Sequence, residues 1–212
     1  MSRSPQDEEK RIDALYEQQR QAGAAACVIG VDEVGRGSVA GPLTVAAVVL
    51  PLEPQIPGLN DSKKLTAHQR EQTAQAIREV ASAIGIAHIT PAEIDRLGMA
   101  ASLRTAMAQA IEACGLAPDL VLIDGRPMHI HEKERCIVKG DGSVACIAAA
   151  SIVAKVTRDA LMVEADPLYE GYGFAANKGY ASAEHIRVIQ ERGLTPFHRA
   201  SFCHNFLQQQ LF

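Results

Sequence analysis

An apolar run that ends in two adjacent carboxylates, Val28-Ile29-Gly30-Val31-Asp32-Glu33, constrains the fold of this chain more than any other stretch. The apolar part is continuous rather than alternating, which indicates a strand buried on both faces. Buried carboxylates carry a desolvation cost unless a metal ion or a basic partner neutralises them. Neighbouring side chains on a strand point to opposite faces, so Asp32 and Glu33 share one ligand only where the strand ends or bends. The Gly35-Arg36-Gly37 segment just beyond favours such a bend.

The size and composition of the chain indicate one globular domain with an aliphatic core. Of its 212 residues, 47% are hydrophobic and 22% are charged, and Trp is absent. The net charge of −4 gives no global basic signature of a nucleic-acid-binding protein, although local basic patches still bind phosphates. Five cysteines without CxxC spacing predict reduced thiols and a cytoplasmic location. No apolar run reaches about 18 residues, so neither a signal peptide nor a membrane span is expected.

The order of the predicted elements indicates an α/β fold. Strands are predicted at residues 27–34, 43–50, 84–89, 119–123 and 135–138. Helices are predicted at residues 7–21, 67–82, 99–114, 143–164 and 182–192, with a helical turn opening at Thr90-Pro91 and a loop at 193–202. The first two strands are so close in sequence that we expect them to form a hairpin beside the acidic residues. Without an internal repeat, this order predicts a mixed sheet and a helical C-terminal portion.

Acidic residues follow three of the predicted strands. Asp32 and Glu33 end the first, Asp124 ends another, and Asp141 follows the last. Because ligands of α/β proteins gather where strands end, we expect these four carboxylates to meet at one edge of the sheet. Carboxylate oxygens bind Mg²⁺ or Mn²⁺, and two such ions activate water and stabilise the leaving oxygen in phosphoryl transfer. The alternative is that Asp124 and Asp141, each followed by glycine, are turn residues.

Two other motifs have a competing interpretation. Residues 35–40 (GRGSVA) also fit a dinucleotide-binding fingerprint, with Glu53 near the place of its ribose-binding acid. That fingerprint must open a helix, whereas Pro42 and β-branched residues follow here, so we reject it. His129 and His131 have the spacing of transition-metal ligands on a strand, but a polar loop without further soft ligands is favoured.

The predicted helix at 143–164 carries a polar stripe. Ser151, Lys155 and Arg158 lie at spacings of four and three residues and therefore share a face, which we expect to contact phosphates. An ordinary ion pair between Lys155 and Asp159 is the alternative. The basic side chains that we expect to extend this surface are Arg36, Lys63 and Lys64.

Three of the four tyrosines of the chain fall within twelve positions. Tyr169, Tyr172 and Tyr180 lie in a glycine-rich loop, where a tyrosine ring is able to stack on a sugar or a base. Rings that cap the edge of the core explain the same composition. The sequence leaves both interpretations open.

Taken together and in order, these motifs resemble the bacterial ribonuclease HII family. The blocks that carry the resemblance are residues 30–37 (GVDEVGRG), 61–65 (DSKKL), 122–125 (LIDG), 139–141 (KGD), 149–159 (AASIVAKVTRD) and 178–180 (KGY). Each block alone is weak, whereas the ordered set, which spans residues 26–202, is specific.

The resemblance implies a ribonuclease H fold, in which helices flank a five-stranded mixed sheet. It implies Mg²⁺- or Mn²⁺-dependent hydrolysis of the RNA strand of RNA–DNA hybrids and incision 5′ to a single ribonucleotide in duplex DNA. With two metal ions, we expect 5′-phosphate and 3′-OH ends. We expect an N-terminal extension at residues 1–25, a catalytic domain at 26–202, a tail at 203–212 and a monomeric enzyme. An extension of this length is too short for the extra domain of the related ribonuclease HIII.

The resemblance also implies roles for individual residues. The four metal ligands of the family map to Asp32, Glu33, Asp124 and Asp141. Gly35, Arg36 and Gly37 map to the element that reads the ribose 2′-OH, largely through backbone groups. Tyr180 maps to a tyrosine that packs on the sugar beyond the ribonucleotide. Residues similar to the family's phosphate-facing side chains are Lys63, Lys155 and Arg158.

Two positions depart from the commonest family pattern. Ser38 stands where a proline often follows Gly-Arg-Gly, and Asn177 stands where a histidine often precedes Lys-Gly-Tyr. Neither maps to a metal ligand, so we expect any effect to fall on substrate fine tuning. Two rival functions remain: another metal-dependent nuclease on this fold, such as a junction resolvase, and a non-catalytic nucleic-acid-binding module with a relict acidic cluster.

The last five residues carry a motif outside this family pattern. The sequence QQQLF resembles the QxxLF peptide by which bacterial proteins dock on the replication sliding clamp. Leu211 and Phe212 would fill an apolar pocket while Gln208 hydrogen-bonds its rim. The alternative is a tail helix that packs Phe206, Leu207 and Leu211 on the domain.

Overall fold

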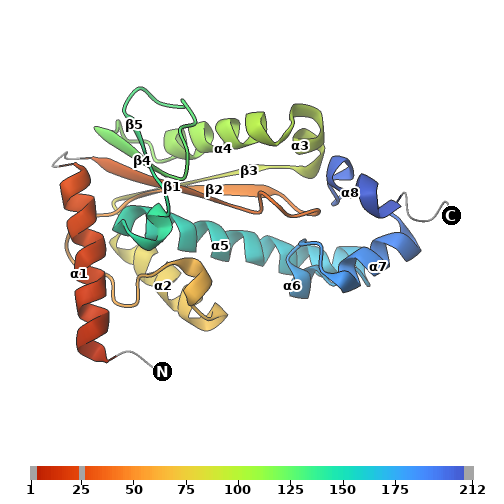
Figure 1. The fold of residues 1–212 in the computed structure, drawn as a ribbon, viewed down its shortest axis with the longest axis horizontal. Helices are drawn as coiled ribbons and strands as arrows, with labels where there is room; N and C mark the ends of the chain where they lie inside the picture. Colours follow the sequence, from red (N-terminus) through yellow and green to blue (C-terminus); the bar gives the residue numbers. More distant parts are fainter. Residues whose placement is uncertain (1–3, 24–26, 208–212) are drawn as a thin grey trace.

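The computed structural model describes residues 4–23 and 27–207, and it shows helices on both sides of one mixed sheet (Figure 1). The strands are β1 (Val28–Val34), β2 (Leu43–Val49), β3 (Ala83–Ile89), β4 (Leu120–Asp124) and β5 (Glu134–Ile137). The helices are α1 (Pro5–Ala22), α2 (Ala67–Val80), α3 (Pro91–Leu97), α4 (Met99–Ala113), α5 (Ala145–Ala165), α6 (Phe174–Asn177), α7 (Ala183–Arg192) and α8 (Ala200–Leu207). Short 3-10 turns are η1 (Ser62–Lys64), η2 (Gly140–Gly142) and η3 (Asp166–Tyr169).

Within these described residues, the five strands have the order β3-β2-β1-β4-β5. β1 pairs antiparallel with β2, which confirms the predicted hairpin, and β2 pairs antiparallel with β3. β1 and β4, and then β4 and β5, run parallel. The parallel strands end at the same edge of the sheet, so Asp32 near the end of β1 and Asp124 at the end of β4 become neighbours. The predicted five-stranded mixed sheet flanked by helices is confirmed.

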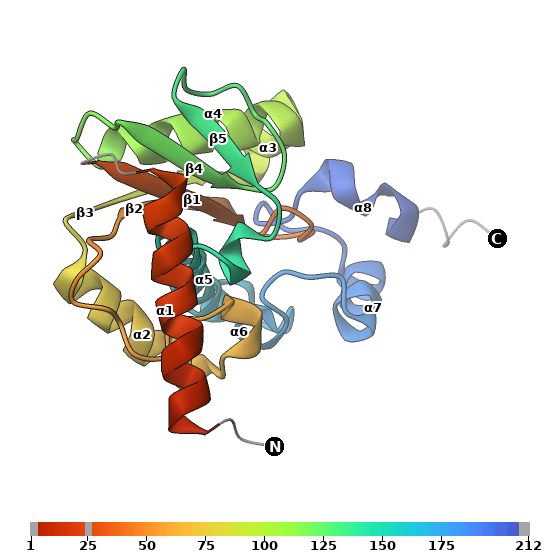
Figure 2. The same ribbon diagram turned by 60° about the vertical axis from the view of Figure 1, so that its left-hand side comes forward.

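Helices lie on both faces of the sheet (Figure 2), and an aliphatic cluster fills the space on each face. α5, with α2 and α1 beside it, packs on one face, and α4 packs on the other. α1 buries Ile12, Leu15 and Tyr16 in the first cluster. Its Gln19 donates to the carbonyl of Leu50 at 2.7 Å and accepts from the backbone amide of Cys146 at 2.8 Å. The predicted N-terminal extension therefore contributes directly to the core.

The contact between α5 and β1 depends on Gly30. A Cβ atom at this position would lie 2.3 Å from the backbone carbonyl carbon of Cys146 and 2.6 Å from the amide nitrogen of Ile147. Only a residue without a side chain permits this approach of helix backbone to strand backbone. As a result the first turns of α5 lie directly against β1, beside the acidic edge of the sheet.

The C-terminal region differs from the predicted loop and tail. α8 begins at Ala200, so the predicted boundary at residue 202 falls inside a helix. The side chain of Asp95 in α3 accepts hydrogen bonds from the backbone amides of Ala200 and Ser201 at 2.8 and 3.1 Å. The cap of α8 thus comes from a residue about a hundred positions earlier, which no local pattern reveals. The last five residues, which carry the QxxLF motif, lie outside the described residues.

Two further sequence predictions concern the whole chain. All five cysteines lie in the described ranges and are free thiols, as predicted. None of the helices in the described ranges has the length and apolar character that crossing a bilayer requires.

The close contact at Gly30 generates a test of the fold. Gly30→Ala is expected to lower the free energy of unfolding by about 1–3 kcal/mol, because the new methyl group overpacks the interface between α5 and β1. Urea denaturation followed by circular dichroism measures this change. Gly142→Ala is the control, since a Cβ there meets nothing within 4 Å. Equal stability of the two variants would contradict this account of the packing.

Candidate active site

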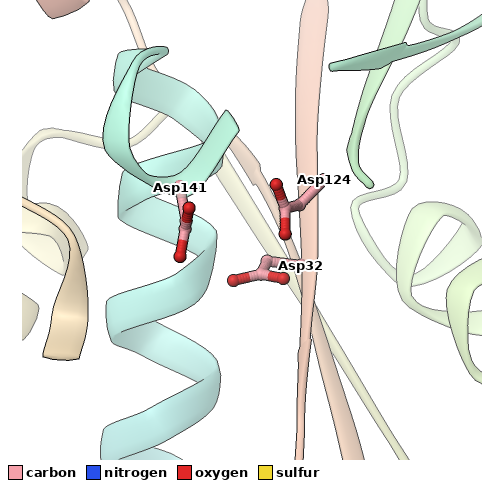
Figure 3. A group of neighbouring side chains, drawn as sticks. All are labelled: Asp32, Asp124 and Asp141. Atoms are coloured by element: carbon pink, nitrogen blue, oxygen red, sulfur yellow. The ribbon is translucent and has the colours of Figure 1, made fainter. Parts of the chain in front are cut away.

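Three carboxylates from three separate elements converge at one edge of the sheet (Figure 3). Asp32 comes from β1, Asp124 from the last position of β4, and Asp141 from η2. One oxygen atom of each lies within 4.8 Å of the others. Asp32 and Asp141 are buried, and Asp124 is partly exposed. The structure therefore brings together three of the four predicted metal ligands, and neither Asp124 nor Asp141 is merely a turn residue.

Each of these carboxylates is held by a neighbour in the chain or in the fold. Asp32 accepts from the backbone amide of Glu33 at 2.8 Å and from the hydroxyl of Ser151. Asp124 accepts from the backbone amide of Gly140 at 2.7 Å. Asp141 accepts from the ammonium of Lys63 at 2.9 Å. Free oxygen atoms of the three side chains thus face a common space (Figure 3).

Glu33 is placed differently from these three residues. β1 remains paired with β2 through Val34, so the predicted bend at the acidic pair does not occur. Asp32 lies on the α5 face and Glu33 on the opposite face, as strand alternation requires. The Glu33 carboxylate lies 3.6 Å from the guanidinium of Arg36 and still lines the pocket described below. In the described part of the chain, Glu33 does not belong to the group of three carboxylates whose oxygen atoms lie within 4.8 Å of one another.

Burial and mutual repulsion perturb the acidic cluster. Desolvation, followed by the charge of Glu33, raises the pKa of Asp32 well above its ordinary value. Desolvation and the charge of Asp141 raise the pKa of Asp124, and desolvation also raises the pKa of Glu33. All of these donors are oxygen atoms, which suit hard divalent cations, and Lys63 already supplies one positive charge at Asp141. The residues present therefore fit a divalent metal ion.

The cluster opens into a pocket of about 330 Å³. Of the predicted site residues in the described ranges, all but Asp141 and Arg158 line it. Asp141 lines a neighbouring groove of about 530 Å³ that shares Lys63 with this pocket. The residues that the pocket joins to the acidic cluster are Gly35, Arg36, Gly37, Lys63, Ser151, Lys155 and Tyr180.

Comparison with known proteins decides what this arrangement is. The family model described as ribonuclease HII matches residues 29–205. The chain belongs to the ribonuclease HII family. It is 46% identical to ribonuclease HII of Enterococcus faecalis over 82% of this chain and 69% of that protein. It is 49% identical to ribonuclease HII of Cereibacter sphaeroides over 87% of this chain and 88% of that protein.

Solved structures agree with this assignment. Ribonuclease H2 of Pyrococcus horikoshii superposes with a TM-score of 0.73 at 25% identity, over 86% of this chain and 98% of that one. Ribonuclease HII of Archaeoglobus fulgidus, solved in complex with PCNA, gives a TM-score of 0.74 at 25% identity over 87% and 98%. Enzymes of the ribonuclease HII family hydrolyse the RNA strand of RNA–DNA hybrids and use divalent metal ions. The predicted family, fold and enzyme class are confirmed.

Arg158 does not face the pocket of this ribonuclease HII homologue. Its side chain is fully buried, and it donates to the carbonyls of Pro42, Ala40 and Lys178 and to the hydroxyl of Ser38 at 2.8–3.0 Å. The predicted phosphate contact is therefore replaced by contacts to the backbone. Arg158 holds the glycine-rich turn in place rather than meeting substrate.

Arg199, which sequence reasoning missed, performs the same task from the C-terminal side. It is fully buried and donates to the carbonyls of Gly35 at 2.7 Å, Arg36 at 3.3 Å and Gly41 at 2.9 Å. Burial, followed by the charge of Arg158, lowers the pKa of Arg199 to about 9, so it remains cationic at neutral pH. Arg199 thus draws the carbonyls of Gly35 and Arg36 inward, while Arg158 holds Ser38, Ala40 and Pro42 just after the turn. No periodicity in residues 193–202 signals this role.

Gly35 has to be glycine in this turn. Its φ is +86°, and a Cβ atom would lie 2.2 Å from Nε of Arg158. The hydroxyl of Ser38 donates to the Gly35 carbonyl at 2.8 Å and accepts from Arg158 at 2.8 Å. Ser38, one of the two departures from the family pattern, therefore closes the turn through its own hydrogen bonds.

The three loop tyrosines have different surroundings. Tyr172 is buried beside Phe174, and Tyr169 stacks on Phe197, so both belong to an aromatic cluster. Tyr180 is 40% exposed and lines the pocket. Asn177, the other departure, donates to the carbonyl of Tyr172 at 2.8 Å and accepts from the amide of Gly179 at 2.7 Å. Of the three tyrosines, Tyr180 is the one that lines the pocket.

Other polar residues around the pocket have partners in the protein. Lys155 pairs with Asp159 at 2.7 Å, as the alternative interpretation predicted, and Lys64 lies 3.6 Å from Asp61. The hydroxyl of Ser151 shares a 2.9 Å hydrogen bond with that of Ser62. The pocket residues that sequence reasoning missed are Val34, Ser62 and Arg70. His129 and His131 line a surface groove away from the acidic cluster.

The raised pKa values of the acidic cluster predict that the carboxylates suited to bind metal lower the stability of the metal-free protein. In chelator at pH 7, Asp32→Asn is expected to raise the Tm by about 2–4 °C, because it removes one of several repelling, desolvated charges. The pKa of Asp32 is higher in the folded state than in the unfolded state. Its ionised carboxylate therefore destabilises the fold above that pKa, and this destabilisation disappears as the pH falls toward about 4. The gain of the variant is expected to disappear over the same range.

Thermal denaturation with and without Mn²⁺ checks this prediction. Mn²⁺ is expected to raise the Tm of the unaltered protein and to have a much smaller effect on Asp32→Asn. Asp13→Asn makes the same chemical change on an exposed residue of α1 and should leave both measurements unchanged. An Asp32→Asn protein that is less stable in chelator, or equally stabilised by Mn²⁺, would contradict the electrostatic account.

Proposed function

We propose that this protein incises duplex DNA 5′ to a single embedded ribonucleotide, in addition to hydrolysing the RNA strand of RNA–DNA hybrids. The observation that carries the proposal is that the acidic cluster and the Gly35–Gly37 turn line one pocket with Tyr180. A site for a hard cation and a surface for reading a sugar thus lie side by side. Free cysteine thiols favour the reducing cytoplasm as the compartment where the enzyme works.

Asp32, Asp124 and Asp141 would hold one Mg²⁺ or Mn²⁺ ion. Glu33 points to the opposite face of β1 but lines the same pocket near the end of the strand, so it would act as the fourth ligand only toward a second ion. Such ions supply an activated water and neutralise the charge that develops on the departing 3′-oxygen. The protein's own contribution is to fix the carboxylates, through Ser151 for Asp32 and the Gly140 amide for Asp124. The expected products carry 5′-phosphate and 3′-OH ends.

Selection of RNA over DNA requires contact with the 2′-hydroxyl, since that group distinguishes the two sugars. Because Arg199 draws the carbonyls of Gly35 and Arg36 inward, the amide side of the turn is available to the pocket. We propose that Gly35, Arg36 and Gly37 contact the 2′-hydroxyl there. The exposed ring of Tyr180 packs on the next sugar.

Lysines beside the cluster are suited to hold the phosphates of the substrate. Lys63 and Lys155 line the pocket, and the adjacent groove adds Lys64 and Lys139 next to Asp141. Lys63 borders both hollows, so these lysines lie beside the carboxylates where they would form a basic path for the cleaved strand. Arg158 supports this surface from inside through the turn.

The function is tested with three duplexes of the same sequence: all DNA, DNA with one ribonucleotide, and an RNA–DNA hybrid. In Mg²⁺ or Mn²⁺ we expect cleavage of the second and third only, with the second cut on the 5′ side of the ribonucleotide. Asp124→Asn is expected to lower the rate by about 10²-fold or more, because it weakens the cation site. Asp13→Asn serves again as the control.

Cleavage of the all-DNA duplex would support the rival junction-resolvase type of nuclease. Binding without metal-dependent turnover would support the non-catalytic module. Cleavage of the hybrid without incision at the single ribonucleotide would confine the enzyme to its family's broader activity. Mapping of the product ends separately tests the predicted 5′-phosphate.

A second proposal concerns the QxxLF sequence at residues 208–212. We propose that Gln208, Leu211 and Phe212 bind the replication sliding clamp. The relative from Archaeoglobus fulgidus, solved in complex with PCNA, supports an interaction of this class. The Leu-Phe pair supplies the apolar anchor and the glutamine supplies a hydrogen bond to its rim.

Clamp binding is expected to be lost when Gln208, Leu211 and Phe212 are replaced together by alanine. The matched control is the replacement of Gln209 and Gln210, the two unspecified positions of the motif, which should leave binding intact. Titration of purified bacterial clamp by calorimetry measures both. Undiminished binding after removal of residues 208–212 would end the proposal, while cleavage of the ribonucleotide duplex would remain unaffected.

A further inference from the structure

Two buried histidines lie next to the pocket-lining tyrosine without forming part of the pocket. The Nε2 atoms of His185 and His198 are 3.1 Å apart, and the side chains are 0% and 4% exposed. At one end of the pair, Nδ1 of His185 lies 2.8 Å from the carbonyl oxygen of Tyr180. At the other end, Nδ1 of His198 lies 3.0 Å from the backbone amide and 2.9 Å from the hydroxyl of Thr195.

These partners fix the protons on both rings. The Tyr180 carbonyl only accepts, so Nδ1 of His185 carries a hydrogen. The Thr195 amide only donates, so Nδ1 of His198 carries none and its hydrogen is on Nε2. His198 then donates from Nε2 to the lone pair on Nε2 of His185. Burial, followed by the neighbouring His185, lowers the pKa of His198 to about 4, in agreement with two neutral rings at pH 7.

The rings around the pair are aromatic. Phe174 packs edge-on against His185, and Tyr172 packs edge-on against His198, with ring centroids 5.5 and 5.1 Å apart. Aromatic rings therefore hold the pair from the sides, and its direction is set by the Tyr180 carbonyl at one end and by the amide and hydroxyl of Thr195 at the other. The result is a chain of three hydrogen bonds from Thr195 to Tyr180.

This chain closes a ring of contacts around the glycine-rich turn. Val39 and Ala40 both donate from their amides to the carbonyl of Gly179, at 2.8 and 3.1 Å. On the other side, Gly41 donates to the carbonyl of Phe197 at 2.8 Å. The segment after the Gly-Arg-Gly turn thus lies between the segment that ends at Tyr180 and the segment that contains His198. The histidine pair ties those two outer segments to each other.

We propose that His185 and His198 are positioning residues that hold Tyr180 in register with the Gly35–Gly37 turn and so set the selection of a single ribonucleotide. This inference rests on the proposed function. The two walls that contact the sugar come from distant parts of the chain, and the histidine pair fixes the backbone of one against the support of the other. Neither imidazole touches the substrate.

A double-mutant cycle with Tyr180 tests this inference. His185→Phe keeps a ring in the aromatic cluster but removes both hydrogen bonds, and it is expected to lower incision at a single ribonucleotide about tenfold. In a Tyr180→Ala background the same change is expected to have almost no further effect, because the ring that it positions is gone. His185→Asn, whose amide still donates toward the Tyr180 carbonyl, is expected to recover part of the loss.

Val188→Ala is the matched control, since Val188 is buried on the same helix, α7, outside the histidine pair. It should lower the Tm without changing the ratio of single-ribonucleotide incision to hybrid cleavage. The inference would be overturned if the double variant lost incision at a single ribonucleotide by the product of the losses in His185→Phe and Tyr180→Ala. An equal loss of incision at a single ribonucleotide in His185→Phe and His185→Asn would also overturn it.

Nitrogen-15 NMR of the imidazole rings gives a readout that does not depend on activity. The expected spectrum shows hydrogen on Nδ1 of His185 and on Nε2 of His198 at pH 7. Rings that exchange between tautomers would overturn the inference even if the enzyme is active. Failure of the unaltered enzyme to incise at a single ribonucleotide would instead count against the proposed function, and is recognised by hybrid cleavage with unchanged NMR spectra.

Discussion

The backbone contact between α5 and β1 is the constraint on which the rest of the structure depends. Gly30 allows the helix to lie directly on the strand that carries Asp32. The helix then delivers Ser151 to that carboxylate, and the η2 turn just before it delivers Asp141. Further along, Arg158 of the same helix reaches the turn after β1. One packing contact thus aligns the acidic cluster with the Gly-Arg-Gly turn that lines the same pocket.

The site is built from separated charges of opposite sign. Carboxylates gather at the edge of the sheet, where desolvation and repulsion raise the pKa values of Asp32, Glu33 and Asp124. Behind the neighbouring turn lie two guanidinium groups that bond to carbonyl oxygens, not to carboxylates. Such an arrangement keeps anionic ligands available for a cation and places fixed positive charge beneath the turn that lines the pocket. The small net charge of the chain conceals this division.

Much of this architecture follows from local sequence. Continuous apolar runs predict the buried strands, and acids at the strand ends predict a cation site, because both patterns act within a few residues. The Gly-Arg-Gly turn and Tyr180 are identified only through their resemblance to the family. The sequence misses contacts made at long range. Asp95 caps α8, and Arg199 binds the turn after β1, across about a hundred residues or more.

The direction in which a side chain points is the other feature that the sequence predicts incompletely. Helical spacing places Ser151, Lys155 and Arg158 on one face, yet residues 38–42 and the Lys178 segment cover the end of that face, so Arg158 is buried. Strand alternation, by contrast, places Asp32 and Glu33 on opposite sides, and the structure keeps that rule.

The ammonium of Lys63 beside Asp141 has a consequence for how the enzyme is charged with metal. Its side chain is largely in solvent, whereas the carboxylate that it pairs with is almost fully enclosed. A divalent ion held by this carboxylate would have to displace a tethered monovalent cation, so its loading would be an ion exchange rather than a simple addition. The displaced lysine, on its flexible four-carbon stem, would then be available to the phosphates of a polyanionic substrate.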